Sequence, residues 1–194
     1  PGGEEELFSL KELVALFSLE GITKAGGRFD PKRCKWFNQQ YLHKADSALV
    51  ESSLAQLLQQ KGIDNASVST ADVVGLVQDR LTLLTDLWDE AYFFFVAPVE
   101  YDEKAVRKQW KEETPQILSA VMNSIENAHD AQAETLSAGI KLWANENNIK
   151  LGMIMAPLRI ALVGALKGPE VFAICSVLGK AECVKRIASA IDKN

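Results

Sequence analysis

The stretch MAPLRIALVGALKGPEVFAICSVLGKAECVKRI, residues 155 to 187, decides the fold class. A strand, a glycine turn and a helix in this order would open a nucleotide-binding fold, and IALVG is the one segment of the chain with strand character. Pro157, just before it, suits the first turn of a helix equally well. Because the neighbouring segments all have helical spacing, we interpret residues 157 to 163 as a short buried helix.

The rest of the chain carries the signals of helix starts. A capping box begins at Ser9, a cap followed by proline occurs at Asp30 and again at Thr114, and Ser69 precedes a long apolar run. Further helices are expected over residues 46–61, with Leu49, Leu54, Leu57 and Leu58 inward, over residues 70–95 as one helix that Pro98 ends, and over residues 130–147. The sequence predicts an all-α helical bundle of nine or ten helices.

Composition excludes several classes of protein. No apolar run among the 194 residues reaches the roughly 18 needed to cross a bilayer, and no basic leader precedes an apolar core. Three cysteines and two histidines show no metal-ligand spacing, so we expect reduced thiols in a cytoplasmic protein and no metal site. The chain begins at Pro1 without a methionine, so we expect a piece of a longer protein.

The charge is unevenly distributed. The net charge of −5 argues against nonspecific binding of nucleic acid, DNA included. Yet residues 20–46 hold six Lys/Arg against three Asp/Glu, residues 141–194 hold eight against four, and residues 70–135 hold five against thirteen. Local basic patches at both ends therefore remain available to an RNA.

Three motifs in order resemble one family. They are RFDPKRCKWFNQQYL at residues 28–42, VVGLVQDRLTLLTDLWDEAYFFF at residues 73–95, and the opening stretch. Together they resemble the C-terminal, anticodon-binding region of bacterial glutamyl-tRNA synthetases. The class I signatures H-x-G-H and K-M-S-K-S are absent. The resemblance therefore implies a chain without cofactors and inactive by itself, whose parent enzyme binds ATP and Mg in a catalytic domain that this chain lacks.

The resemblance also implies an organisation and a partner. Residues 1–45 would be the end of a connecting, stem-contacting domain with an entry helix. Residues 46–140 would form a first helical anticodon-binding subdomain, and residues 141–194 a C-terminal one. The expected partner is tRNA(Glu), bound by a monomer and positioned for glutamylation. The alternative from another class is a helical protein-interaction module without RNA binding, which the acidic middle favours.

The opening stretch contains the main candidate site residues. Arg159 offers a rigid fork of donors that suits a base edge or a phosphate. The turn at Gly168-Pro169 lets backbone approach a base, Phe172 could turn its ring outward to stack on one, and Val171 adds an apolar contact. The resemblance implies that these residues line the anticodon pocket. The structural alternative is that Phe172 belongs to the core and Arg159 caps a helix.

Weaker candidates lie earlier in the chain. The resemblance implies that an arginine in the helix of Arg80 helps to select the anticodon, although pairing with Asp79 or Asp86 is the simple alternative. Five basic residues are candidates to follow the tRNA backbone, with a solvated surface as the alternative: Lys24, Arg28, Lys32, Arg33 and Lys35. The aromatic residues Trp36, Phe37, Tyr41 and Phe93 to Phe95 have the helical spacing typical of a core.

Overall fold

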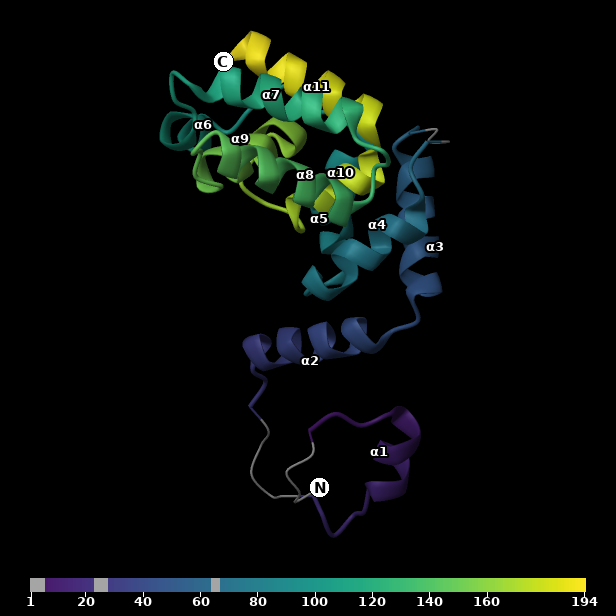
Figure 1. Cartoon of the computed structure of the whole chain (residues 1–194). Helices are drawn as coiled ribbons and strands as arrows, with labels where there is room; N and C mark the ends of the chain where they lie inside the picture. The colour runs from purple at the N-terminus through teal and green to yellow at the C-terminus, as the bar shows by residue number, and fades with distance from the viewer. Residues whose placement is uncertain (1–5, 23–27, 64–66) are drawn as a thin grey trace.

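The computed structural model describes residues 6–22, 28–63 and 67–194. Within these ranges the chain forms eleven α-helices and two short 3-10 helices, with no strand. The molecule is elongated and bent, with α1 and α2 at one end and α6 to α11 gathered at the other (Figure 1). The predicted all-α class is confirmed, and IALVG is helical.

The N-terminal half contains α1 (Leu10–Leu16), α2 (Pro31–Lys44), α3 (Ser47–Gln60), α4 (Thr70–Val77), η1 (Gln78–Arg80), η2 (Leu84–Asp86) and α5 (Leu87–Phe95). The C-terminal half contains α6 (Glu103–Gln109), α7 (Thr114–Asn127), α8 (Ala133–Glu146), α9 (Gly152–Val163), α10 (Val171–Leu178) and α11 (Lys180–Lys193).

Side-chain caps set most of the predicted helix starts. Ser9 forms the expected capping box with Glu12, and Asp30 accepts hydrogen bonds from two backbone N–H groups ahead of Pro31. Ser69 caps α4 through the N–H of Asp72. Thr114 is the first residue of α7 rather than its cap, and its hydroxyl accepts from the Lys111 N–H. These local signals therefore located helix starts to within one residue.

The expected single helix over residues 70–95 is broken. The chain leaves the helical path at Leu81, where φ is −74° and ψ is 130°, and passes through η1 and η2 before α5. Gln78, buried at this break, donates from Nε2 to the carbonyls of Leu42 and Ala45, both at 2.9 Å. Gln78 therefore holds the C-terminal end of α2 against η1.

The helix expected at residues 157–163 is longer than predicted. It begins at Gly152, so Pro157 lies inside it rather than in its first turn. Proline within a helix leaves one carbonyl without its helical donor. The helix ends at Gly164, whose φ of +85° reverses the chain after Val163.

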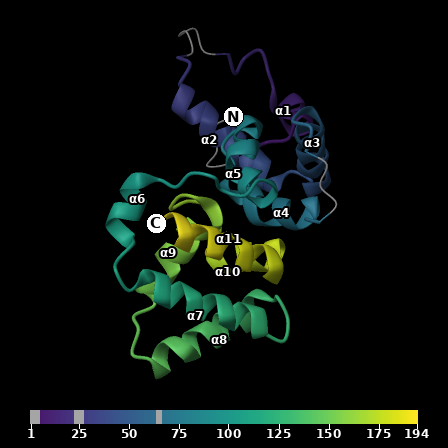
Figure 2. The same cartoon turned by 90° about the horizontal axis from the view of Figure 1, so that it is seen from above.

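One apolar core joins α3 to α11. Figure 2 shows α7, α8, α10 and α11 side by side, and α11 packs along both α7 and α9. The predicted subdomain border between residues 140 and 141 falls inside the continuous helix α8. Helices α7 and α8 pack against α9, α10 and α11, so residues on both sides of that border share one core, and the division into subdomains stays a prediction.

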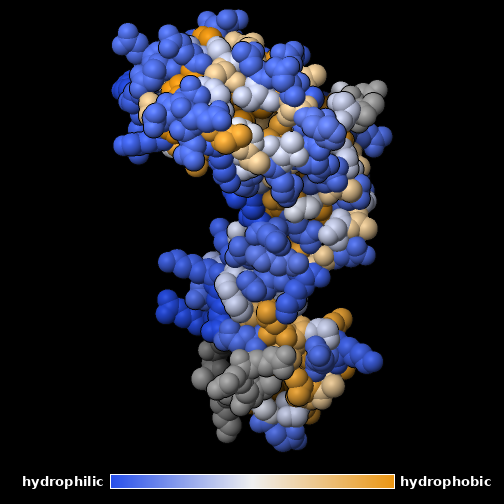
Figure 3. Space-filling model, in the orientation of Figure 1, coloured by the Kyte–Doolittle hydropathy of each residue, from blue (hydrophilic) through white to orange (hydrophobic). Residues whose placement is uncertain are grey.

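Some expected core positions are exposed. Leu49 is 63% exposed, because Val50 instead turns inward beside Leu54. The helix α1 buries no residue, and apolar surface gathers over this end of the molecule, orange in Figure 3. That surface comes from exposed apolar side chains, Leu10, Leu13, Val14, Leu16, Phe17, Leu19 and Ile22. The main core therefore does not extend to the N-terminal helix.

Candidate nucleic-acid interface

Arg159 on α9 holds the turn that leads into α10. Its Nη1 donates to the carbonyl oxygens of Lys167 at 3.1 Å and Gly168 at 3.2 Å, and also to that of Pro169. Glu170 then caps α10 by accepting from the Ala173 N–H at 2.8 Å. The arginine therefore braces the turn, a role that the sequence did not predict for it.

Part of the Arg159 guanidinium remains available. Within the described residues its Nε and Nη2 groups have no hydrogen-bond partner, while the side chain is half-buried. Burial lowers the pKa of Arg159, the charge of Glu170 opposes that shift, and the charge of Arg80 adds to it. Arginine stays protonated at neutral pH, so a partly desolvated positive charge faces the site. Such a group favours an anion or a polar base edge.

The fold requires glycine at position 168. Its φ of +96° is one that glycine adopts readily, and an added Cβ would lie 3.0 Å from Cζ of Phe93. The turn thus packs directly on α5, and Figure 1 shows the α9–α10 connection passing that helix. Glycine at position 168 therefore has a structural cause, and the approach of its backbone to a base stays a prediction, while Pro169 beside it is buried.

Phe172 and Val171 are core residues. Phe172 is 2% exposed and Val171 is 1% exposed, so the expectation of an outward ring is wrong. Both lie in the first turn of α10, which the packing of Gly168 on Phe93 draws into the core. A base cannot stack on a ring in that position without unfolding the turn.

The charge of Arg80 acts on Arg159 even though 79 positions separate them in the chain. Its Nε donates to Glu90 on α5 at 2.7 Å, so neither Asp79 nor Asp86 is its partner. The charge of Arg80 is near enough to affect the pKa of Arg159. The two arginines that the motifs selected separately therefore interact electrostatically.

Two residues of this site were missed by sequence reasoning. Lys167 donates from Nζ to the carbonyl of Asp89 at 3.0 Å, and the same Nζ lies 4.7 Å from the ring centroid of Tyr92. Burial raises the pKa of Tyr92, and the charge of Asp89 raises it further. Lys167 could have been suspected because it directly precedes Gly168, whereas nothing in the sequence places Tyr92 beside it.

The basic residues near α2 are distributed differently. Lys24 lies outside the described residues. Arg28, Lys32 and Lys35 are exposed, while Arg33 pairs with Glu6 and lies over the ring of Phe37 at 5.7 Å. These residues remain candidates for backbone contacts that the structure does not test.

The aromatic core prediction is partly correct. Phe93 and Phe94 are buried, as expected. Trp36 is 40% exposed and Tyr41 is 47% exposed, so both are wrong as core residues. They lie on α2, which buries no residue and contacts the main core only near its C-terminal end, through Leu42.

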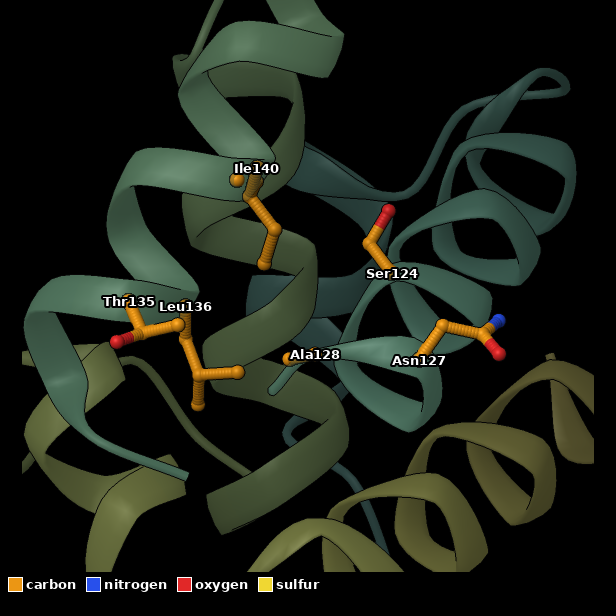
Figure 4. A pocket seen from close by; sticks show the side chains of 7 residues that line it. Ser124, Asn127, Ala128, Thr135, Leu136 and Ile140 are labelled. Carbon is orange, nitrogen blue, oxygen red and sulfur yellow. The ribbon is translucent and has the colours of Figure 1, made fainter. Parts of the chain in front are cut away.

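The pocket between α7 and α8 has no charged side chain in its lining. Figure 4 shows this pocket of about 270 Å³, which is lined by Ser124, Asn127, Ala128, Thr135, Leu136, Gly139 and Ile140. Among the described residues no group of His, Cys, Asp or Glu could hold a metal ion.

In that same part of the chain no helix is both long and apolar enough to cross a membrane.

Comparison with known proteins defines the class. Residues 33–191 match the model of the anticodon binding domain family. The chain belongs to this family.

Its relatives are glutamate–tRNA ligases. The chain is 43% identical over 190 residues to that of Flavobacterium johnsoniae and 38% identical over 192 residues to that of Christiangramia forsetii, with 98% and 99% of the chain aligned. The crystal structure of a glutamate tRNA ligase from Elizabethkingia meningosepticum, in complex with its amino acid, superposes with a TM-score of 0.90 at 33% identity. The match covers 96% of this chain and 37% of that one.

The likeness is to one part of those proteins. The chain spans 38% of the length of the two curated relatives, and it is homologous to their non-catalytic C-terminal region. The family match supports the anticodon-binding interpretation, and nothing in the comparisons supports the protein-interaction alternative.

Proposed function

We propose that the chain recognises the anticodon of tRNA(Glu), as the C-terminal part of a glutamate–tRNA ligase. It acts as a monomer in the cytoplasm and positions the tRNA for a catalytic domain that uses ATP and Mg. The chain itself contributes no catalytic group. Binding energy obtained at the anticodon acts remotely, since it holds the acceptor end where the reaction occurs.

The observation that carries this proposal is the half-free guanidinium of Arg159. Nη1 is fixed by the carbonyls of residues 167 to 169, which orients the whole plane of the fork. Among the described residues nothing accepts a hydrogen bond from Nε or Nη2, so both groups are available to a ligand. Splayed anticodon bases are read through polar edges, and an oriented fork can discriminate between them. Arg80, held by Glu90, adds a second oriented cation nearby.

The test is a titration of a labelled anticodon stem–loop RNA followed by fluorescence anisotropy. One RNA carries the glutamate anticodon, and its matched copy carries three changed anticodon bases. The parent chain should prefer the first RNA. Arg159→Ala should lose about 1–3 kcal/mol of binding, a factor of about 5 to 150, together with most of that preference.

Three further variants make the result specific. Arg159→Lys keeps the positive charge but loses the planar fork of donors. It should therefore bind both RNAs with nearly the parent's affinity and lose most of the preference for the glutamate anticodon. Arg80→Ala should weaken binding, and Lys185→Ala, whose side chain is 77% exposed on α11, should not. Equal binding of both RNAs by the parent chain, or unchanged binding by Arg159→Ala and Arg80→Ala, would refute the proposal.

A further inference from the structure

A row of alternating cations and rings crosses α5. Trp88 and Tyr92 are four positions apart on this helix, with ring centroids 6.2 Å apart. Lys61 Nζ lies 4.4 Å from the Trp88 ring centroid, and Lys167 Nζ lies 4.7 Å from that of Tyr92. We call these four residues the lysine–aromatic row.

The row draws on three separate parts of the chain. Lys61 is the C-cap of α3, the two rings come from α5, and Lys167 belongs to the turn between α9 and α10. Both rings are half-buried, so each keeps solvent-facing surface. The cations are flexible lysines rather than fixed arginines, and neither has a carboxylate partner among the described residues.

Lys167 connects the row to the site of Arg159. Its carbonyl accepts from Arg159 Nη1, while its ammonium reaches across α5 to the Asp89 carbonyl and the ring of Tyr92. Lys167 is therefore the residue that contacts both Arg159 and the row. In this way the row extends the arginine site across the helix that carries Glu90.

We propose that the row stacks an unpaired base that neighbours those read at Arg159, an inference that rests on the anticodon function proposed above. Tyr92 and Trp88 provide the ring faces, and Lys61 and Lys167 move from the rings to the phosphates on either side of that base. The exchange is favourable because a base stacks on a ring more strongly than an exposed lysine binds it.

The experiment uses the same stem–loop RNA and the whole 194-residue chain. Tyr92→Leu and Trp88→Leu should each weaken binding about 5- to 150-fold at fixed salt, without a change in the salt dependence. Tyr92→Phe should bind as the parent does, because the ring face remains. Trp143→Leu, which removes a half-buried ring of α8, is the matched control and should leave binding unchanged.

The lysines are tested by salt dependence. Lys61→Ala and Lys167→Ala should each lower the slope of log affinity against log salt by about 0.7 to 0.9, whereas Lys185→Ala should not. Lys167→Ala also loses a hydrogen bond to α5, so Lys61→Ala is the cleaner variant. Circular dichroism and urea unfolding establish that each variant is folded. If a leucine variant is not, 2-aminopurine placed at each loop position in turn reports stacking in the parent chain by quenching.

The outcomes separate this proposal from the previous one. If Arg159→Ala and Arg80→Ala weaken binding while folded Tyr92→Leu and Trp88→Leu do not, the row is not an RNA site and the anticodon function stands. Absence of quenching at every loop position has the same meaning. If the parent chain binds no stem–loop RNA, both proposals are wrong.

Discussion

A Cβ atom at Gly168 would lie 3.0 Å from Cζ of Phe93, so the α9–α10 turn packs against the last turn of α5. Gly168→Ala would therefore place a methyl group in this close contact and also force alanine into a φ of +96°. Backbone strain of this kind costs about 1–3 kcal/mol, so we expect the free energy of unfolding to fall by at least that amount. Urea unfolding followed by circular dichroism measures the change.

A matched glycine gives the control. Gly139 lies in the interior of α8, and a Cβ there would meet nothing within 4 Å. Gly139→Ala should therefore raise the free energy of unfolding by about 0.5–1 kcal/mol through helix propensity. Equal effects of both substitutions would contradict the role given to the contact with Phe93.

Phe172 should behave as a core residue in experiment. Because its side chain is 2% exposed, Phe172→Ala should cost about 3–5 kcal/mol of stability through lost burial and a cavity. Phe172→Leu keeps most of the volume and should cost about 1.5 kcal/mol or less. At temperatures where it is folded, Phe172→Leu should bind the stem–loop RNA as the parent does. Normal stability together with lost RNA binding would restore the stacking role that the sequence first indicated.

The helix starts could be predicted because their causes are local. A cap such as Asp30 and the N–H groups it accepts from lie within three residues, so the sequence alone contains the interaction. The break after Arg80 could not be predicted in this way. It depends on Gln78 reaching carbonyls of Leu42 and Ala45, more than 30 positions earlier.

The candidate site shows the same division. Arg159 and Gly168 are nine positions apart, and the sequence selected both for one candidate site without predicting the hydrogen bond between them. Which side of α10 faces solvent depends on how the turn packs on α5, so the sequence could not predict the orientation of Phe172. The electrostatic effect of Arg80 on Arg159 and the cation–π contact between Lys167 and Tyr92 both depend on the tertiary fold.

Cys175 should make stability depend on pH. The neighbouring Cys183 thiol and burial raise the pKa of Cys175 well above its ordinary value. Below the ordinary thiol pKa of about 8.5, both the folded and the unfolded chain hold the proton, and the free energy of unfolding is unaffected. Above it the unfolded chain loses the proton while the folded chain keeps it, so the free energy of unfolding should fall as pH rises. Urea unfolding between pH 7.5 and about 10 measures this dependence.

Cys175→Ala is the control for that measurement and should flatten the alkaline fall. In the native chain the exposed Cys34 should react with a thiol reagent at pH 8, while the buried Cys175 and Cys183 should not. A pH dependence that survives in Cys175→Ala would assign it to another group.

Arg186 should be the most costly charged residue to remove. Its side chain is 3% exposed on α11, and its Nη1 donates to the carbonyls of Phe93 at the end of α5 and Leu162 at the end of α9. Its Nε pairs with Glu182 at 2.7 Å. Arg186→Ala leaves two buried carbonyls and a carboxylate without their donor, so we expect a loss of about 3–5 kcal/mol. Because the Arg186 side chain is 3% exposed, the loss should change little with salt.

The neighbouring positions test whether burial is the cause. Glu182 is 31% exposed, so Glu182→Gln should cost only about 1 kcal/mol, since water replaces part of the pair. Lys185→Ala, one position before Arg186 and 77% exposed, should stay within about 0.5 kcal/mol of the parent. Urea unfolding of the three variants at low and high salt gives the comparison. If Arg186→Ala lost no more stability than Lys185→Ala, then α5 and α9, which carry Glu90 and Arg159, would be held together by apolar packing alone.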